Sequence, residues 1–375
     1  MNSPKKSTEA VDRRHMMVAL TLARRSLGNV WPNPAVGCVL VGADGSVVGR
    51  GWTQPGGRPH AETEALKQAG SYARGSTAYV TLEPCSHYGE TPPCAEALVA
   101  ADVARVVVAI EDPDARVSGR GIARLKDAGI DVKIGVCAGA AEKINAGFLL
   151  HRREGRPLVT LKTASTLDAR IATHGGQSQW ITGEEARRRG HLLRKTHDAI
   201  VVGIGTALAD DPELTCRLPG MEGDSPVRVV VDTHLKLPLE SKLVQSAKAV
   251  PTWIVVSSET KIERQDEYAL FGVEFIKVAP GEGHHPETLS VLKALAARGL
   301  TRLLVEGGGT LSAAFLRARL IDRVAWFRAP GAIGGDGIPV FEAYGVDQLS
   351  DMRRFVLESI EPVGKDMLET YCVAD

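Results

Sequence analysis

The sequence predicts an α/β protein with about two domains, because its 375 residues exceed what one hydrophobic core usually holds. Apolar runs at 106–110 and 132–136 are typical of buried strands, and the segment 121–128 between them is typical of a helix. This βαβ order favours a mostly parallel sheet. The Gly- and Pro-bounded basic run 151–157, which follows an expected helix over 140–150, indicates a linker. We therefore place the domains at residues 1–153 and 154–375.

Composition excludes several classes of function. Lys plus Arg and Asp plus Glu both number 45, so a general electrostatic hold on nucleic acid is not expected. The first 14 residues are polar, and the longest apolar runs are too short to cross a bilayer. The six cysteines are scattered, which favours a reducing compartment over a disulfide framework. We expect a cytoplasmic protein that binds neither nucleic acid nor membrane.

The first elements supply packing and one candidate ligand contact. The apolar spacing over 13–27 predicts a helix that stops at Gly28, and the pair Asp44-Gly45 predicts a hairpin between strands at 38–41 and 47–51. Asn33 lies in a Pro-flanked loop before the first strand. It is either a turn residue that caps its own backbone or an amide that pairs with the edge of a planar heterocycle.

A zinc site is indicated by the segment 60–94. His60 precedes a helix expected at 61–70, Cys85 follows a strand expected at 77–81, and Cys94 opens a helix expected at 95–101. One imidazole and two thiolates leave the fourth position of a tetrahedral zinc open for water, which is typical of a catalytic site. Glu62 lies two residues after the histidine, where a carboxylate can move protons. Zinc-dependent nucleobase deaminases use this set of groups.

Other interpretations of the same residues compete with this one. A structural zinc module would need a fourth protein ligand, for which His87 in the loop between the cysteines is available. A deaminase of polynucleotides or free bases would use the same three ligands, although the neutral charge and the long insert between the cysteines count against it. A chain with only one active half is a third possibility.

The second half alternates strands and helices. Strands are expected at 158–162, 199–202, 227–231, 253–257 and 303–305, and helices at 184–194, 288–298 and 311–320. Thr182 with Glu185 three residues later reads as a capping box. The run Glu306-Gly-Gly-Gly-Thr310 joins a strand to a helix, as in anion sites, or is a tight turn without a ligand. Gly203-Ile-Gly205 resembles only half of a dinucleotide fingerprint, and 331–337 is a second glycine loop.

Motifs in both halves resemble one family. In the first half they are Asn33-Pro-Ala-Val-Gly37, Thr81-Leu-Glu-Pro-Cys85 and the eight-residue insert that begins after Cys85. In the second half they are Lys162, Leu167-Asp168, the run 178–182, the run 208–212 and the run 305–310. Together they resemble the bifunctional deaminase/reductase of riboflavin biosynthesis over nearly the whole chain. Ala169 departs from the pattern, because the family commonly has glycine after the aspartate.

The resemblance implies a cytidine-deaminase-like domain followed by a dihydrofolate-reductase-like domain, not a Rossmann domain. It implies Zn²⁺ on His60, Cys85 and Cys94, Glu62 as the proton carrier, and Asn33 as the residue that orients the ring. The implied substrate is 2,5-diamino-6-ribosylamino-4(3H)-pyrimidinone 5′-phosphate. Its product would then have the ribosyl group reduced by NADPH, and the enzyme would be a homo-oligomer.

The resemblance also implies the contacts of the reductase site. Cofactor contacts would be made by Ala164, Trp180, Thr206, Asp210, Thr233, Gly308, Gly309, Thr310, Leu311, Ser312, Ala313 and Ala314. Substrate contacts would be made by Ser178, Arg194, Leu214, Arg217 and Glu306. The two arginines suit a 5′-phosphate, unless they are ordinary surface residues. Lys162, Asp210 and Glu306 are candidates for polar or proton-handling roles.

Overall fold

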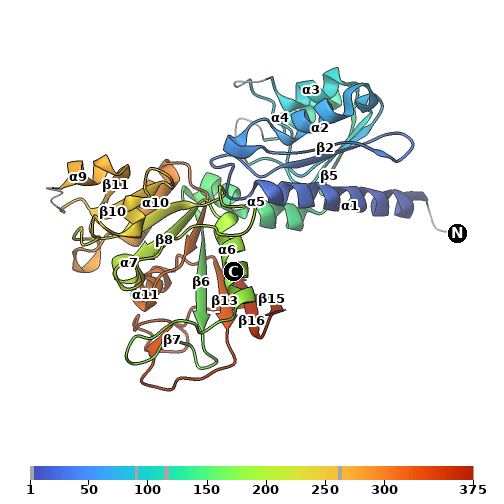
Figure 1. The fold of residues 1–375 in the computed structure, drawn as a ribbon. Coiled ribbons are helices and arrows are strands. Elements are labelled where there is room, and N and C mark those ends of the chain that lie inside the picture. Colours follow the sequence, from blue (N-terminus) through green and yellow to red (C-terminus); the bar gives the residue numbers. More distant parts are fainter. Residues whose placement is uncertain (1–3, 89–91, 114–117, 261–263, 375) are drawn as a thin grey trace. The chain divides into compact units, whose positions relative to one another are not determined.

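A mixed sheet of five strands forms the centre of the N-terminal unit, residues 1–154, and a sheet of nine strands forms the centre of the C-terminal unit, residues 155–375 (Figure 1). The computed structural model describes residues 4–88, 92–113, 118–260 and 264–374, and these strand numbers refer to that part of the chain. Each unit has its own buried apolar core around its sheet.

The N-terminal unit has three layers. Strand order is β2-β1-β3-β4-β5, with β1 antiparallel to both its neighbours and the others parallel. Helices α1 and α5 cover one face, and α2, α3 and α4 cover the other (Figure 1). The elements are α1 (Pro4–Ala23), β1 (Gly37–Val41), β2 (Val47–Trp52), α2 (Ala61–Ala69), β3 (Thr77–Val80), α3 (Cys94–Ala100), β4 (Arg105–Val108), α4 (Arg120–Asp127), β5 (Asp131–Ile134) and α5 (Ala138–Glu154).

Two glycines allow helix α2 to lie directly on strand β2. A Cβ at Gly51 would come within 2.0 Å of the Ala61 carbonyl oxygen, and a Cβ at Gly49 within 2.2 Å of the Ala65 carbonyl oxygen. Any side chain at either position would push the helix away from the sheet. This close packing fixes the start of α2, where His60 is the residue that precedes the first turn.

Two sequence predictions in this unit are wrong. The first helix begins at Pro4 and ends at Ala23, followed by a 3₁₀ turn, instead of covering 13–27. The basic run 151–154 is the last turn of α5 and not a linker. Arg and Glu are good helix formers, so charge alone does not end a helix; Gly155 ends it with a φ of +66°. The hairpin at Asp44-Gly45 and the βαβ unit are confirmed.

The C-terminal unit is built on a long parallel sheet. Its elements are β6 (Leu158–Ser165), β7 (Arg170–Ala172), α6 (Glu184–Lys195), β8 (Ala199–Gly203), α7 (Ile204–Asp210), β9 (Val227–Val231), α8 (Lys242–Gln245), β10 (Thr252–Ser257), α9 (Gln265–Leu270), β11 (Val273–Val278), α10 (Thr288–Ala297), β12 (Arg302–Val305), α11 (Gly309–Arg317), β13 (Arg323–Arg328), β14 (Ile338–Pro339), β15 (Phe355–Val363) and β16 (Asp366–Val373).

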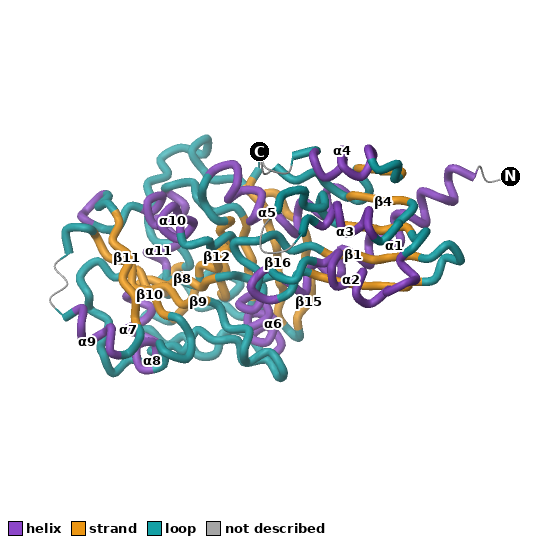
Figure 2. The backbone as a smooth tube through the Cα atoms, turned by 90° about the horizontal axis from the view of Figure 1, so that it is seen from above, coloured by secondary structure: helices purple, strands orange, loops and turns teal. Residues whose placement is uncertain are grey.

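Strand order in the large sheet is β11-β10-β9-β8-β12-β6-β13-β16-β15. Figure 2 shows β11, β10, β9 and β8 grouped together in this unit. The first seven strands in the order are parallel, and the hairpin β15–β16 joins β13 in the antiparallel sense. A parallel sheet that ends in an antiparallel hairpin is the arrangement expected for a dihydrofolate-reductase-like domain and differs from a Rossmann sheet.

Three local predictions in this unit need correction. Thr182 does not cap α6: the capping residue is Gly183, and its N–H donates to Asp366 Oδ2 at 2.6 Å. A carboxylate distant in the sequence therefore supplies the acceptor at this helix start. Strand β6 runs on to Ser165, and α11 begins at Gly309. Strand pairing and helix packing, which extend these elements, depend on distant partners.

Ala169 has a φ of +60°, in the left-handed region that favours glycine. It lies in the turn between β6 and β7, where its N–H donates to the Thr166 carbonyl at 3.1 Å. The departure from the family pattern at this position is therefore a strained turn residue.

His197 makes stability of the C-terminal unit depend on pH. Its Nδ1 lies 2.7 Å from the Leu193 carbonyl oxygen and its Nε2 2.9 Å from Thr160 Oγ1. Burial, aided by the charge of Arg302, lowers the pKa of this histidine to about 3. In the unfolded chain this histidine has an ordinary pKa of about 6.5, so below that pH it binds a proton that it does not bind in the folded chain. The stabilisation is complete above pH 6.5 and is lost as pH falls toward 3.

We predict that the free energy of unfolding of this unit decreases between pH 7.5 and pH 5, with His197 contributing about 2 kcal/mol of the decrease. Urea unfolding of the wild type and of His197→Gln at both pH values measures the contribution. The variant should show a decrease that is smaller by about this amount. The same pH dependence in both proteins would contradict the assignment.

Candidate active sites

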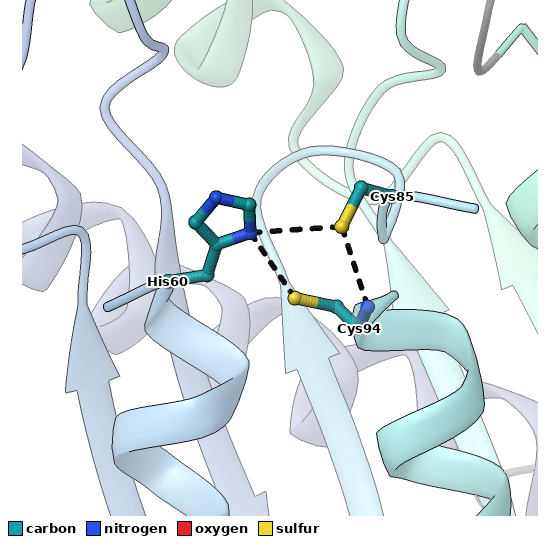
Figure 3. A group of neighbouring side chains, drawn as sticks. All are labelled: His60, Cys85 and Cys94. Carbon is teal, nitrogen blue, oxygen red and sulfur yellow. Dashed lines mark hydrogen bonds between the residues drawn. The ribbon is translucent and has the colours of Figure 1, made fainter. Parts of the chain in front are cut away.

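Three metal-ligating side chains meet at one point of the N-terminal unit. The ligand atoms of His60, Cys85 and Cys94 all lie within 4.8 Å of one another (Figure 3). His60 Nδ1 is 3.2 Å from Cys94 Sγ and 3.6 Å from Cys85 Sγ. One nitrogen and two sulfurs at these separations fit the donor set of a zinc ion with an open position.

Secondary structure places each of the three ligands. His60 caps α2, Cys94 opens α3, and Cys85 lies in the loop after β3, where its sulfur accepts the Cys94 N–H at 3.3 Å. The hydrogen bond with the Cys94 side chain, opposed by burial and aided by His60, lowers the pKa of the Cys85 thiol to about 4. The thiolate is the form of cysteine that binds a metal.

Glu62 lies in the first turn of α2 and is only 3% exposed. Burial, aided by the negative charge of Cys85, raises the pKa of its carboxyl group to about 7. A carboxyl group whose pKa is near neutrality can both accept and return a proton, which a general acid and base must do.

One pocket contains the predicted ring contact together with two of the three metal ligands. Asn33, His60, Glu62 and Cys85 all line it. The amide of Asn33 lies against Gly57, where a Cβ would come within 1.9 Å of Asn33 Nδ2. Lining the pocket favours the ring-contact interpretation of Asn33 over the turn interpretation. His87 lines the same pocket.

Two positioning residues escaped the sequence analysis. The buried carboxylate of Glu83 accepts backbone N–H bonds from Asp112, Gly119, Gly121 and Ile122 at 2.9–3.2 Å, which attaches the loop before Cys85 to the start of α4. Glutamate just before Pro-Cys was a visible signal, because a charged residue closely follows a buried strand there.

Asn145 holds the loop that carries Asn33. From α5, its Oδ1 accepts the Ala35 N–H at 2.9 Å and its Nδ2 donates to the Ala35 carbonyl at 3.1 Å. Asn145 is 2% exposed, so both bonds are shielded from water. A lone polar residue on the apolar face of a helix was the available signal.

The predicted cofactor residues of the C-terminal unit gather at one edge of the large sheet. Ala164 lies near the carboxyl end of β6, while Thr206, Thr233 and Gly308 follow β8, β9 and β12. The order β9-β8-β12-β6 makes these four strands neighbours. Thr206 Oγ1 accepts the Gly308 N–H at 3.0 Å, so two of the predicted contacts touch. The carboxyl edge of a parallel sheet is where α/β proteins bind nucleotides.

The glycine turn before α11 is closely packed. A Cβ at Gly307 would come within 2.8 Å of the Leu311 side chain, and Thr310 Oγ1 donates to Glu342 Oε1 at 2.8 Å. Ser312 and Ala313 are 2% and 3% exposed, so their side chains belong to the core. The backbone at the start of this helix, from Gly308 to Thr310, suits contact with a cofactor phosphate.

Lys162, Arg194 and Glu306 form a charged cluster. Arg194 grips the Glu306 carboxylate with Nε and Nη2 at 2.8 and 2.9 Å, and Lys162 Nζ lies 3.6 Å from Glu306 Oε2. Burial opposes ionisation of Glu306, but the two cations outweigh it and lower its pKa to about 2. Glu306 therefore stays ionised and acts as an acceptor.

Arg194 is engaged by the protein itself. Besides gripping Glu306, its Nη1 donates to the Thr215 carbonyl at 3.0 Å, which favours a positioning role over contact with a phosphate. Arg217 is exposed and pairs with Glu213 at 3.0 Å. Leu214 is 3% exposed, so little of this residue faces solvent.

The remaining predicted contacts lie nearer the surface. Trp180 is 69% exposed, with the Arg187 guanidinium 4.5 Å from its ring centroid. Ser178 is half-buried, and Asp210 is exposed at the end of α7. Asp168 accepts the N–H groups of Ile333 and Gly334 at 3.2 and 2.7 Å. These bonds attach the second glycine loop to the turn between β6 and β7.

Comparison with known proteins identifies both units. Residues 9–110 match the family model of the cytidine and deoxycytidylate deaminase zinc-binding region, and residues 157–368 match the RibD C-terminal domain. The first unit is therefore a zinc-binding deaminase domain, and the second is a pyrimidine reductase-type domain. The chain belongs to the RibD family of riboflavin biosynthesis proteins and carries both the deaminase and the reductase of this bifunctional family.

Relatives match along nearly the whole chain. The riboflavin biosynthesis protein RibD of Bacillus amyloliquefaciens is 41% identical over 94% of each chain, and that of Escherichia coli is 39% identical over 95% of this chain and 98% of its own. The structure of Acinetobacter baumannii RibD is 38% identical and superposes with a TM-score of 0.87 over 98% of this chain and all of that chain.

A second solved structure is 32% identical, with a TM-score of 0.86 over 98% of this chain and all of its own. It is that of a Thermotoga maritima diaminohydroxyphosphoribosylaminopyrimidine deaminase/5-amino-6-(5-phosphoribosylamino)uracil reductase.

Among the helices in the described ranges, none is long and apolar enough to cross a membrane.

Asn145 offers a test of how the loop that carries Asn33 is held. We predict that Asn145→Ala destabilises the N-terminal unit by about 2 kcal/mol, because both polar groups of the buried Ala35 backbone lose their partners. Deaminase activity should fall while zinc content stays at the wild-type level. Thermal unfolding and metal analysis measure the two effects. Glu142→Ala, at an exposed position of the same helix, should change neither stability nor activity. Equal effects of both variants would contradict the role of the Asn145–Ala35 hydrogen bonds.

Proposed function

We propose that the N-terminal unit removes the 2-amino group of 2,5-diamino-6-ribosylamino-4(3H)-pyrimidinone 5′-phosphate by hydrolysis. The observation that carries the proposal is the buried Glu62 in a pocket that is also lined by His60 and Cys85, two of the three clustered zinc donors. Zinc on His60, Cys85 and Cys94 would supply a Lewis acid that acidifies water. Glu62 accepts the proton of the attacking water and delivers it to the departing ammonia, and the Asn33 amide holds the ring edge.

We propose that the C-terminal unit then reduces the ribosyl group of 5-amino-6-(5-phosphoribosylamino)uracil to a ribityl chain. NADPH supplies the hydride when it is bound. Ala164, Thr206, Thr233 and the backbone at Gly308–Thr310 hold the cofactor along the carboxyl edge of the sheet, which is the position favoured for nucleotides. Asp210 and Trp180 stay candidates for cofactor contact at the rim of this edge.

The residues of the charged cluster in the reductase have different polar roles. Glu306, held ionised by Arg194 and Lys162, accepts hydrogen bonds from substrate hydroxyls. Lys162 and Asp210 are then the groups that can handle the proton of the reduction. The exposed Arg217 reaches the substrate phosphate, Ser178 and the Leu214 backbone contact the substrate, and Arg194 fixes the segment around Thr215 from behind.

We predict that the zinc-loaded protein, given the diaminopyrimidine nucleotide and NADPH, releases ammonia first and oxidises NADPH only afterwards. Glu62→Gln should lower ammonia release by about 10²-fold or more while zinc content is unchanged. NADPH oxidation by this variant should be normal when the uracil product is supplied. Glu64→Gln, in the same helix, is the matched control and should behave as the wild type.

Each other outcome removes a part of the proposal. Ammonia without NADPH oxidation would exclude the reductase function. No ammonia from a zinc-loaded wild type would exclude this substrate. A Glu62→Gln protein with full deaminase activity would indicate that the metal is structural.

We also propose that the enzyme is a homo-oligomer that works in the cytoplasm, where its six cysteines form no disulfides. The β15–β16 hairpin supports the assembly. Its register places Leu357, Ile360 and Met367 on one face, with exposures of 48%, 53% and 37%. Leu368 and Val363, on the other face, pack with Ala186 and Leu193 of α6. An apolar sheet face that the chain itself leaves exposed suits a second copy.

We predict that Ile360→Lys lowers the mass of the particle in sedimentation velocity without changing the fold, because a charge on this face opposes its burial. Gln348→Lys, at an exposed position outside the hairpin, is the control for added charge. An unchanged mass for Ile360→Lys, at concentrations where the wild type is oligomeric, would place the contact elsewhere.

A further inference from the structure

The pocket of the deaminase domain has a buried acidic floor and a basic rim. Glu62, on the floor, is 3% exposed, and the zinc donors lie beside it. Arg58 and Arg152 line the same pocket, Arg58 half-buried and Arg152 exposed. A nucleotide monophosphate has a matching shape, with a base that reacts at one end and a dianionic phosphate at the other.

Helix α5 fixes the place of Arg152. Asn145, Phe148 and Arg152 follow each other at spacings of three and four residues, so they share one face of the helix. Asn145 is bonded to the Ala35 backbone, and Phe148 lines the pocket. Arg152 is then about 10 Å along the helix from Asn145, at 1.5 Å per residue. This distance from the loop that carries Asn33 is of the order of the length of a nucleoside.

A ring contact orients Arg152, and the neighbouring residues of the chain fix the place of Arg58. The Arg152 guanidinium lies 5.3 Å from the centroid of the Phe148 ring, and Phe148 is itself 5% exposed. A cation–π contact of this kind holds a guanidinium against the face of a ring. Arg58 lies between Gly57, which packs against the Asn33 amide, and the segment that enters α2 at His60. Its position is therefore tied to both ring contact and metal ligand.

We propose that Arg58 and Arg152 form the phosphate subsite of the deaminase, which binds the 5′-phosphate of the pyrimidine nucleotide while its base reaches Glu62. This inference rests on the proposed function of the N-terminal unit and adds residues to its substrate site. Guanidinium groups are suited to phosphate because they present paired N–H donors to two oxygens. The subsite gives the deaminase a preference for the nucleotide over the corresponding nucleoside.

The test compares the nucleotide with its dephosphorylated nucleoside as deaminase substrates. Arg58→Gln and Arg152→Met should each raise KM for the nucleotide by about tenfold, and the double variant by about a hundredfold, with kcat within a factor of about two. KM for the nucleoside should stay at the wild-type value. Arg153→Met, at the exposed neighbouring position in α5, is the matched control and should leave both values unchanged.

Further measurements separate folding from binding. Zinc content and NADPH oxidation with supplied uracil product should be normal in every variant, which shows that both units are folded. Calorimetric titration with ribose 5-phosphate gives a readout that needs no turnover: the double variant should lose one class of binding present in the wild type.

The outcomes distinguish this inference from the proposed function. A wild type that deaminates the nucleotide, with a double variant whose KM is unchanged, would overturn the subsite alone. Equal increases in KM for nucleotide and nucleoside would show that the arginines support the structure. If the wild type deaminates neither substrate, the proposed function fails, and the ribose 5-phosphate titration still decides whether these arginines bind a phosphate.

Discussion

Parallel strand pairing is the constraint on which both sites depend. In a parallel sheet each crossover returns the chain to the same edge, so the loops after neighbouring strands collect at their carboxyl ends. In the C-terminal unit this brings Thr233, Thr206 and Gly308, which are far apart in the sequence, onto the neighbouring strands β9, β8 and β12. In the N-terminal unit the same geometry places Cys85 after β3 and the Glu83-bound segment after β4.

Buried carboxylates mark the difference between support and chemistry. Glu83 accepts four backbone N–H groups and is a fixed anchor. Glu306 is paired with two cations, so its pKa is lowered to about 2 and it cannot exchange a proton near neutral pH. Glu62 is buried beside a thiolate, so its pKa is raised to about 7. The same functional group has three roles because its neighbours differ in charge and in hydrogen-bond donors.

The backbone around the metal ligands is held by residues that take no part in the reaction. Gly49 and Gly51 let α2 approach β2 closely enough to fix His60, and Asn145 fixes the loop that carries Asn33. Residues of this kind tune a site through position, and their replacement changes activity without touching a ligand. The charged cluster around Glu306 also acts through position. Arg194 bonds both to Glu306 and to the Thr215 carbonyl, so it fixes the segment at Thr215 relative to Glu306.

The sequence by itself indicated an α/β class through its alternating strands and helices, and the two domain types through motifs that resemble one family. It also indicated the zinc donors and the carboxylate beside them, because His60 and Glu62 lie within one helical turn and Cys94 opens a helix. It did not reveal that Gly183 and not Thr182 caps α6, since the acceptor is Asp366, more than a hundred residues away. It also could not show that Arg194 turns inward to Glu306 or that Arg58 and Arg152 share a pocket with Glu62. Only the tertiary structure decided these points, because hydrogen bonds and ion pairs between distant segments depend on how the strands are ordered in the sheet and leave no periodic signal in the chain.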